Sequence, residues 1–487
     1  MALTVPGPPA TNEFVKAALF LPWVAVSAAL AAPEHPPTLH SFRRLHLEKH
    51  YWSEGATFGD LNRDGKPDAI SGPYWWEAPD FTRRHEMYAP RTTFKVRQAD
   101  GTETVLPGFE GALGRRNAYS SDNFFSFVHD LNGDGWNDVL TYGLPGTPAY
   151  LYLNPQGAER PWQRHTVFEK VDNESPTFAD LTGDGKPEII CNHGGNFGYA
   201  APDWGNPTAP WRYTAISAHG KWGNFTHGLG IGDVNGDGRL DYLEKGGWWE
   251  QPPAGAAGAP WARRPVLFSP GGGAQMYAYD VNGDGLNDVI SSIAAHGYGL
   301  AWHEQLREKD TNGHPKFREH TFMNKEPGEN RYGVAFSQLH AVELVDMDGD
   351  GLKDLVTGKC FWAHGPTGDP EPGAPAVLYW FRLVRGPGGR VDWVPHRIDS
   401  DSGVGRQIGV GDANGDGRPD LIIGNKKGTF VFLHEARSVS REEWEKAQPA
   451  VKFATAGDKA LQPGEVIQRT GPPRGARPAP AAPAPPR

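Results

Sequence analysis

Short apolar stretches alternate with short acidic loops along most of the chain. ATFG (56–59), FSFVH (125–129) and GLGIG (228–232) each lead directly into an Asp-rich loop, and after the first loop comes a second apolar stretch, DAIS (68–71). Short runs rich in aromatic and β-branched side chains, bounded by Gly, Asn and Asp, are typical of strands rather than helices. The pattern therefore predicts an all-β protein.

The acidic loop occurs seven times, at intervals of 47 to 70 residues. Repeats of this length, in which strand patterns alternate with turn residues, predict a solenoid or a propeller. The copies are DLNRDGKPD (60–68), DLNGDGWND (130–138), DLTGDGKPE (180–188), DVNGDGRLD (233–241), DVNGDGLND (280–288), DMDGDGLKD (346–354) and DANGDGRPD (412–420).

Each loop has the composition of a calcium site. Ca²⁺ takes six to eight oxygen ligands, so carboxylates and amides at positions 1, 3, 5 and 9 can surround one ion. An EF-hand is excluded because strand-like residues follow the loop where that motif has a helix; metal-free Asx-turns are the alternative. We expect up to seven structural Ca²⁺ ions, with ligands Asp60, Asn62, Asp64, Asp68, Asp130, Asn132, Asp134, Asp138, Asp180, Thr182, Asp184, Glu188, Asp233, Asn235, Asp237, Asp241, Asp280, Asn282, Asp284, Asp288, Asp346, Asp348, Asp350, Asp354, Asp412, Asn414, Asp416 and Asp420.

Four strands can be assigned to each repeat. One strand enters the loop, one leaves it, a third is often aromatic, as in AYLYLN (149–154), and a fourth resembles WQRHTVFE (162–169). Four strands per repeat are typical of a propeller blade. The last repeat lacks its fourth strand, and FRRLHLEK (42–49) has the missing pattern. We therefore predict a seven-bladed β-propeller over residues 40–435, with the ring closed by an N-terminal strand.

These repeats resemble FG-GAP or VCBS repeats, the calcium-loop blades of integrin α-subunit propellers and of many secreted bacterial proteins. The resemblance covers residues 40–435 and implies the propeller fold. It does not imply a function, because this fold carries binding proteins and enzymes alike.

The two ends of the chain differ in composition from the repeats. Residues 1–31 predict a cleaved secretory signal, since AALFLPWVAVSAALA (17–31) is too short for a membrane span and ends in an A-x-A-like site. We expect a C-terminal helical extension over 436–461 and a disordered Pro/Ala-rich tail over 462–487. The mature protein is then secreted or periplasmic, with no membrane span.

The net charge of the chain and the distribution of its Lys and Arg residues bear on which class of partner it binds. The formal net charge is −10, and seven bound Ca²⁺ ions would bring it to about +4. Lys and Arg are scattered rather than clustered, so nothing favours nucleic acid. The two cysteines, Cys191 and Cys360, are too few for a disulfide framework.

Titratable residues recur just before the first strand of a repeat and just after the second, which places them at the channel mouth opposite the calcium loops. Such mouths are typical ligand sites. The candidates for general acid/base catalysis or charge stabilisation are His227, His340, Glu174, Arg406, Glu54 and Lys245. The candidates for substrate binding are His193, His296, Lys359, Gln275 and Trp248. For the tryptophan, packing of an aromatic third strand between blades is the alternative. No HxH or HExxH spacing selects a metal site, so an additional divalent metal at the mouth stays open.

Two segments, GPYWWEAP (72–79) and GGWWEQP (246–252), give a second resemblance, to the propeller part of aldos-2-ulose dehydratases. Those enzymes are lyases that remove water from keto-sugars. The resemblance implies abstraction of a proton next to a carbonyl, with His227 or His340 as the base. It does not extend to the cupin domains of those enzymes.

The leading hypothesis is a secreted, calcium-stabilised propeller that acts on carbohydrate or keto-sugar as a lyase or dehydratase. The alternative is a non-catalytic propeller that binds a glycan or a protein partner. The ring of Glu, His and Arg favours the enzyme, since a simple binder needs fewer titratable groups.

Overall fold

The computed structural model describes residues 36–113, 120–253 and 260–453. These residues form an all-β structure, in which the strands lie in six sheets. The described residues contain one α-helix, α1 (Arg441–Ala447), which begins at a Ser440 side chain that accepts a hydrogen bond from the Glu443 N–H. The helix lies in the segment for which the sequence predicted a helical extension. The predicted signal segment 1–31 and tail 462–487 lie outside the described residues.

Two sheets each contain four antiparallel strands in sequence order. In both, the acidic loop joins the first strand to the second, which is why one repeat of the sequence gives one such sheet. The strands are β2 (Ala56–Gly59), β3 (Asp68–Ser71), β4 (Tyr74–Trp76) and β5 (Arg84–Glu86) in one, and β23 (Val342–Val345), β24 (Asp354–Gly358), β25 (Leu378–Gly386) and β26 (Arg390–Asp399) in the other.

A seven-stranded sheet has the order β14-β13-β12-β11-β10-β9-β8. It is continuous because β11 (Gln163–Ala179) has 17 residues and pairs with β10 through its first part and with β12 through its second. The other strands are β8 (Phe125–His129), β9 (Asp138–Tyr142), β10 (Thr147–Leu153), β12 (Glu188–His193), β13 (Asn196–Ala201) and β14 (Arg212–Ala215).

An eight-stranded sheet has the order β18-β17-β16-β15-β19-β20-β21-β22. Its two halves join where β15 (Leu229–Gly232) pairs in parallel with β19 (Gln275–Tyr279). A Cβ on Gly230 would lie 1.9 Å from the Met276 carbonyl oxygen, so this approach requires glycine. The other strands are β16 (Asp241–Glu244), β17 (Gly247–Glu250), β18 (Ala262–Pro265), β20 (Asp288–Ser292), β21 (Leu300–Lys309) and β22 (Pro315–Met323).

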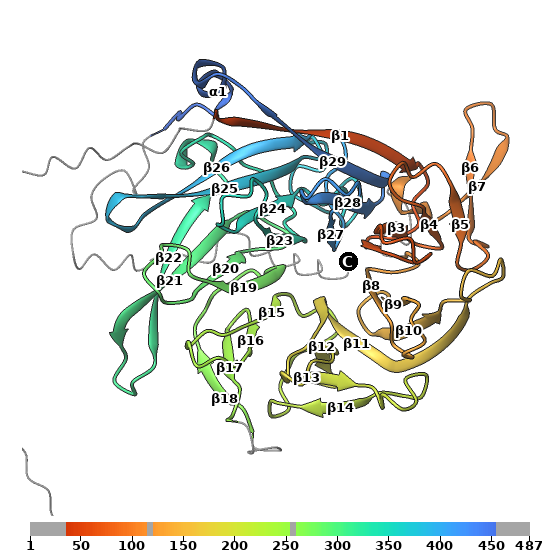
Figure 1. Ribbon diagram of the computed structural model, residues 1–487, viewed down its shortest axis with the longest axis horizontal. Helices are drawn as coiled ribbons and strands as arrows, with labels where there is room; N and C mark the ends of the chain where they lie inside the picture. Colours follow the sequence, from red (N-terminus) through yellow and green to blue (C-terminus); the bar gives the residue numbers. More distant parts are fainter. Residues whose placement is uncertain (1–35, 114–119, 254–259, 454–487) are drawn as a thin grey trace, which may run out of the picture.

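The first described strand lies in the same sheet as the last ones. β1 (Thr38–Glu48) pairs antiparallel with β29 (Gly428–Ser438) along nearly its whole length, and β28 (Asp420–Asn425) and β27 (Ile408–Gly411) complete that sheet. The sixth sheet is the hairpin of β6 (Thr93–Arg97) and β7 (Glu103–Pro107), which projects from the rest of the molecule (Figure 1). Three short 3₁₀ segments, Glu110–Leu113, Pro327–Glu329 and Pro387–Gly389, lie in connections.

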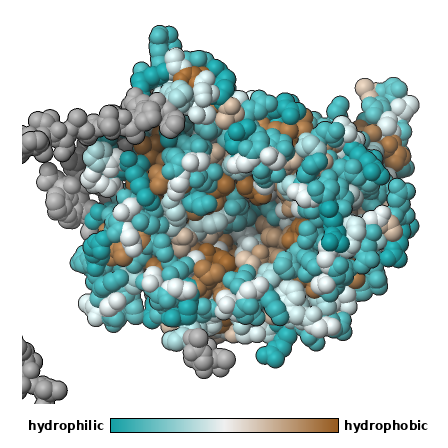
Figure 2. Space-filling view, viewed as in Figure 1, coloured by the Kyte–Doolittle hydropathy of each residue, from teal (hydrophilic) through white to brown (hydrophobic). Residues whose placement is uncertain are grey.

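The larger sheets are set radially around a common centre, with β8, β15, β19, β23 and β27 innermost (Figure 1). This arrangement is propeller-like. Figure 2 shows a central hollow in one face, with hydrophilic and apolar residues at its rim. The hydrophobic core is divided into clusters, one of which packs Trp248 against Leu243, Phe268 and Met276.

Candidate functional site

Four side chains with metal-binding atoms meet between the inner strands, and we call them the histidine cluster: Glu174, His227, His296 and His340. One ligand atom from each lies within 4.8 Å of the others. Glu174 is in β11, His227 precedes β15, His296 follows β20 and His340 precedes β23. The cluster therefore joins three sheets, and it contains three of the six residues predicted to be catalytic and one predicted to bind substrate.

Backbone hydrogen bonds between neighbouring repeats hold these residues in place. The Glu174 N–H donates to the Thr226 carbonyl at 2.8 Å, next to His227. The Arg406 N–H donates to the Glu54 carbonyl, also at 2.8 Å. The residue before it must be glycine, since a Cβ on Gly405 would lie 2.0 Å from that same carbonyl oxygen. At these two positions the chain before the inner strand is thus held against the neighbouring repeat.

Two of the four side chains are buried, and the cluster is poorly hydrogen-bonded. His340 is 2% exposed, Glu174 is 5% exposed, and neither ring nitrogen of His340 has a hydrogen-bond partner. Glu174 Oε2, His227 Nε2 and His296 Nδ1 also lack one. Buried polar atoms in folded proteins are nearly always hydrogen-bonded, so a concentration of exceptions calls for an explanation.

His227 shows how these atoms are arranged. Its Nδ1 lies 2.9 Å from the Phe225 carbonyl oxygen, which can only accept, so Nδ1 carries the proton. Its Nε2 lies 3.2 Å from Glu174 Oε2. Nε2 therefore faces a carboxylate oxygen, and the two groups form an ion pair when the ring is protonated.

Arg406 supplies positive charge beside the cluster. Its Nη2 lies 3.8 Å from Glu174 Oε2, and its side chain is 1% exposed. Burial acts to raise the pKa of Glu174, but Arg406 and His227 outweigh it and the pKa falls to about 2. Burial, followed by repulsion from nearby cationic groups, lowers the pKa of His296 to about 3 and that of His340 well below its ordinary value. Glu174 is therefore ionised, and His296 and His340 are neutral.

Glu54, whose backbone carbonyl accepts from the Arg406 N–H, belongs to a second group of buried side chains. Its Oε1 accepts hydrogen bonds from Lys426 Nζ and, at 3.0 Å, from the Tyr51 hydroxyl. Both Glu54 and Lys426 have side chains that are 1% exposed. Burial and the Glu54 charge raise the pKa of Tyr51 well above its ordinary value. Glu54, predicted to be catalytic, is held in the interior as the counter-ion of Lys426.

A His–Asp pair that the sequence did not single out adjoins the cluster. His364 Nδ1 donates to Asp369 Oδ1 at 2.7 Å, and the His364 backbone N–H donates to Asp369 Oδ2 at 2.8 Å. The His364 ring centroid lies 4.3 Å from that of His296. The His364 side chain is 25% exposed, whereas that of Asp369 is 1% exposed. His364 falls in CFWAHG (360–365), a segment outside the repeated pattern.

Lys359 fixes the loop that carries Asp369. Its Nζ donates to Ser337 Oγ at 2.6 Å and to the Pro370 carbonyl at 3.2 Å. Burial lowers the pKa of Lys359. Only 1% of the residue is exposed, so this predicted substrate-binding residue serves in the structure to hold the loop.

The other predicted site residues lie apart from the cluster or have structural contacts. Gln275 ties inner strands together, donating to the Arg406 carbonyl at 3.0 Å and accepting from the Val342 N–H at 2.9 Å. His193 Nδ1 lies 3.0 Å from the Lys170 carbonyl. Trp248 is 1% exposed in the core, so its ring offers no surface to a sugar. Lys245 is half-buried beyond β16, with no described contact to the cluster.

The acidic loops are ordered by their own side chains. In the first loop, Asp60 accepts from the N–H groups of Asp64 and Gly65 at 3.1 and 3.0 Å. The position-9 carboxylate, Asp68, accepts from Leu61 and Ala78 and is fully buried, so backbone donors already engage a group expected to complete the ion's shell. Among the described residues, metal-type groupings of three carboxylates occur in two loops, Asp180, Asp184 and Glu188, and Asp346, Asp348 and Asp354.

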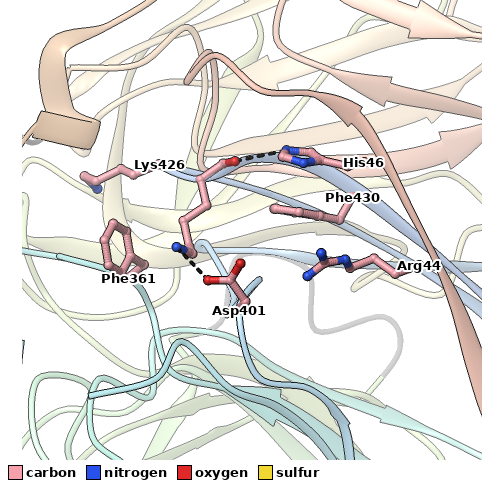
Figure 3. Close-up of a pocket in the computed structure, with 7 residues that line it drawn as sticks. Arg44, His46, Phe361, Asp401, Lys426 and Phe430 are labelled. Atoms are coloured by element: carbon pink, nitrogen blue, oxygen red, sulfur yellow. Dashed lines mark hydrogen bonds and ion pairs between the residues drawn. The ribbon is translucent and has the colours of Figure 1, made fainter. Parts of the chain in front are cut away.

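A surface pocket lies at the sheet of β1 and β27–β29 (Figure 3). Lys427 bonds Asp401 at 2.9 Å and lies over the Phe361 ring at 4.6 Å. His46 stacks on Phe430. Because its cations are paired, we assign no ligand to this pocket. The lining residues are Arg44, His46, Phe361, Asp401, Lys426, Lys427 and Phe430.

Two segments match family models. Residues 130–191 match the FG-GAP-like repeat and residues 404–432 match the FG-GAP repeat. These two segments resemble FG-GAP repeats. The predicted resemblance is thereby confirmed, and the all-β, propeller-like structure agrees with it.

A search of curated proteins gave no match. Among solved structures, a lectin from Agrocybe aegerita that recognises non-reducing terminal N-acetylglucosamine is 15% identical, with a TM-score of 0.38, over 70% of this chain and 86% of the lectin. A rhamnogalacturonan lyase from Bacillus licheniformis is 12% identical, with a TM-score of 0.34, over 81% of this chain and 72% of the lyase. At such scores these likenesses carry no argument about function. In the described part of the chain, no helix has the length and apolar character of a membrane span.

Proposed function

We propose that this protein is a secreted or periplasmic propeller that acts on carbohydrate as a lyase or dehydratase at the histidine cluster. The observation that carries the proposal is the convergence of Glu174, His227, His296 and His340 with the His364–Asp369 pair. A non-catalytic glycan- or protein-binding propeller has no need of so many buried titratable groups, which are costly to the fold.

The proposed fold is a closed ring of seven blades, each built on one acidic loop. The continuous sheets support this: β11 is long enough to serve two blades, and the β15–β19 pairing joins two more. The pairing of β1 with β29 supports closure of the ring by the N-terminal strand. Each acidic loop is proposed to bind one structural Ca²⁺.

The proposed reaction is β-elimination from a keto-sugar or a uronate. His364, which Asp369 orients, takes the proton from the carbon next to the carbonyl. The electron pair forms a C=C bond as the C–O bond at the β carbon breaks. The leaving oxygen receives a proton from His364 and departs as water or as an alcohol, which balances the step.

His364 replaces His227 and His340 as the proposed base. His340 is 2% exposed, and burial holds its pKa well below the ordinary value, so it does not exchange protons with a substrate near neutral pH. His364 has the larger exposed surface, at 25% of its side chain. Its pairing with a buried carboxylate fixes the tautomer that leaves Nε2 as the basic atom.

The test follows ultraviolet absorbance while the purified protein is incubated with keto-sugars and uronate-containing glycans. We expect a new conjugated enone or unsaturated uronate, and a rate at least about 10²-fold lower for Asp369→Asn. The matched control is Glu304→Gln, since Glu304 pairs at 2.7 Å with His320, a partly buried ring outside the cluster. No new absorbance with any substrate, or equal rates for Asp369→Asn and the control, contradicts the proposal.

A further inference from the structure

We propose that Glu174, His227, His296 and His340 bind one divalent transition metal ion such as Zn²⁺. This inference goes beyond the proposed reaction and stands without it, because it rests only on how the four side chains are arranged. It also assigns the cluster a metal of a different class from the one expected in the acidic loops.

The ligand types favour this class of metal. Imidazole nitrogen suits Zn²⁺, Fe²⁺, Cu²⁺ and Ni²⁺, whereas Ca²⁺ selects oxygen. The four candidate atoms lie within 4.8 Å of one another, and ligands about 2.0–2.2 Å from a central Zn²⁺ would be separated by no more than about 4.4 Å. A small adjustment of side chains therefore forms a compact site.

The unpaired polar atoms of the cluster fit a bound cation. His340 has no hydrogen bond at either nitrogen although it is 2% exposed. His227 Nε2 and Glu174 Oε2 face one another 3.2 Å apart. A metal ion bound by both replaces this single contact with two coordinate bonds, and it gives His340 a partner that nothing else in the described structure supplies by hydrogen bonding.

The surroundings fit a metal ligand set. The hydrogen bond from His227 Nδ1 to the Phe225 carbonyl fixes the ring with Nε2 toward the cluster, which is the usual support for a zinc-binding histidine. Glu174 Oε2 lies 3.2 Å from that nitrogen, so both atoms can contact one ion.

Charge around the site suggests what the bound ion would attract. The carboxylates Glu174 and Glu54 lie beside the cations Arg406 and Lys426, respectively. A divalent ion therefore adds positive charge to a cluster whose carboxylate already has a cation next to it. This favours an oxygen ligand with negative or partial negative charge, such as a sugar carboxylate or carbonyl. The partly exposed His227 and His296 leave that side open to it.

The test is binding of Zn²⁺ alone to the full chain. The protein is stripped with EDTA, returned to excess Ca²⁺ so that the acidic loops are filled, and dialysed against low Zn²⁺, with bound zinc measured by mass spectrometry. We expect one Zn²⁺ per chain, and affinity weaker by at least about 10²-fold in His340→Ala and His227→Gln. His320→Ala, which removes a partly buried histidine paired with Glu304 outside the cluster, is expected to keep full affinity.

Substitution with Co²⁺ gives a second readout that does not depend on activity. Nitrogen- and oxygen-bound Co²⁺ gives visible absorption, and we expect it in the wild type and in His320→Ala but not in His227→Gln. Because the His227 side chain is 13% exposed, its Gln variant is expected to fold even if His340→Ala does not. Absence of stoichiometric Zn²⁺ in the wild type, or undiminished binding in His227→Gln, overturns the inference. Zinc binding without any elimination activity would overturn the proposed function alone.

Discussion

His227 Nε2 and Glu174 Oε2 lie 3.2 Å apart, while the other nitrogen of His227 is committed to the Phe225 carbonyl. Side chains from two neighbouring repeats are thus held facing one another. A metal ion between them would accept a lone pair from each, as proposed above. In the proposed account, the functional residues lie where the inner strands begin, and the acidic loops stabilise the scaffold.

Removing the Glu54 carboxylate is expected to destabilise the fold. Glu54→Gln leaves Lys426, 1% exposed, as a buried cation without its counter-ion, close to the Arg406 charge. The expected loss is about 3 kcal/mol, measured as a fall in melting temperature or in urea midpoint with Ca²⁺ present. Glu435→Gln, which removes an exposed partner of Arg43, is the control and should cost less than about 1 kcal/mol. Equal losses would contradict the assignment of Glu54 to the interior.

Calcium removal is expected to lower stability. A ligand present at about one hundred times its dissociation constant contributes about 2.7 kcal/mol per site to the folded state. EGTA should therefore reduce the melting temperature strongly, and Asp64→Ala should bind about one ion fewer per chain by metal analysis. Asp310→Ala is the matched control, because Asp310 accepts two backbone N–H groups in an ordinary turn outside the acidic loops. A melting temperature that is indifferent to EGTA would exclude calcium in the loops.

Glu343 is expected to make stability fall as pH rises. Burial raises its pKa to about 7, above the value of about 4.3 for an unfolded chain. The contribution of protonated Glu343 to the free energy of unfolding is therefore complete below about pH 4 and is lost as pH rises through about 7. Glu343→Gln should remove this slope and stabilise the protein at pH 8 relative to the wild type, by about 1–2 kcal/mol. Urea unfolding at pH 5 and pH 8 measures it, and identical slopes in the two proteins would contradict it.

Trp248 is expected to matter for stability and not for sugar recognition. It is 1% exposed and packs in a core cluster, so Trp248→Ala should cost about 3–5 kcal/mol. Phe225→Ala, at a ring that is 51% exposed, should change stability by less than about 0.5 kcal/mol. Thermal melts of the two variants distinguish these outcomes, and a small effect at Trp248 would mean that its ring is not part of the core.

Much of the site could be predicted from repeat spacing. Glu174, His227, His340 and Arg406 each lie six residues before the first aspartate of a loop, and the strand between fixes where they emerge. The same offset also selects Glu54, but spacing alone does not reveal that Lys426 and Tyr51 would enclose it. The spacing in the sequence predicts at which end of the channel a residue lies. Whether its side chain faces solvent is decided by packing.

His364 and Asp369 could not be found in this way, because they lie in an insertion between β24 and β25 that has no counterpart in the repeat. Their pairing depends on the Lys359 and Ser337 contacts to Pro370, which join segments from separate parts of the chain. Trp248 failed as a binding residue for the opposite reason. The aromatic side chains of the third strand pack between sheets. The amino-acid composition of that strand does not distinguish such packing from stacking on a sugar.

A crystal structure of the calcium-loaded protein soaked with Zn²⁺ and a keto-sugar tests most directly whether the histidine cluster is the working centre. Anomalous diffraction at the zinc edge should show one strong peak, about 2.0–2.2 Å from a nitrogen of His227, His296 and His340 and from a Glu174 oxygen. A sugar oxygen should complete the shell on the side that faces His364. A cluster without a zinc peak, with the sugar bound elsewhere, would contradict both the metal assignment and the proposed reaction.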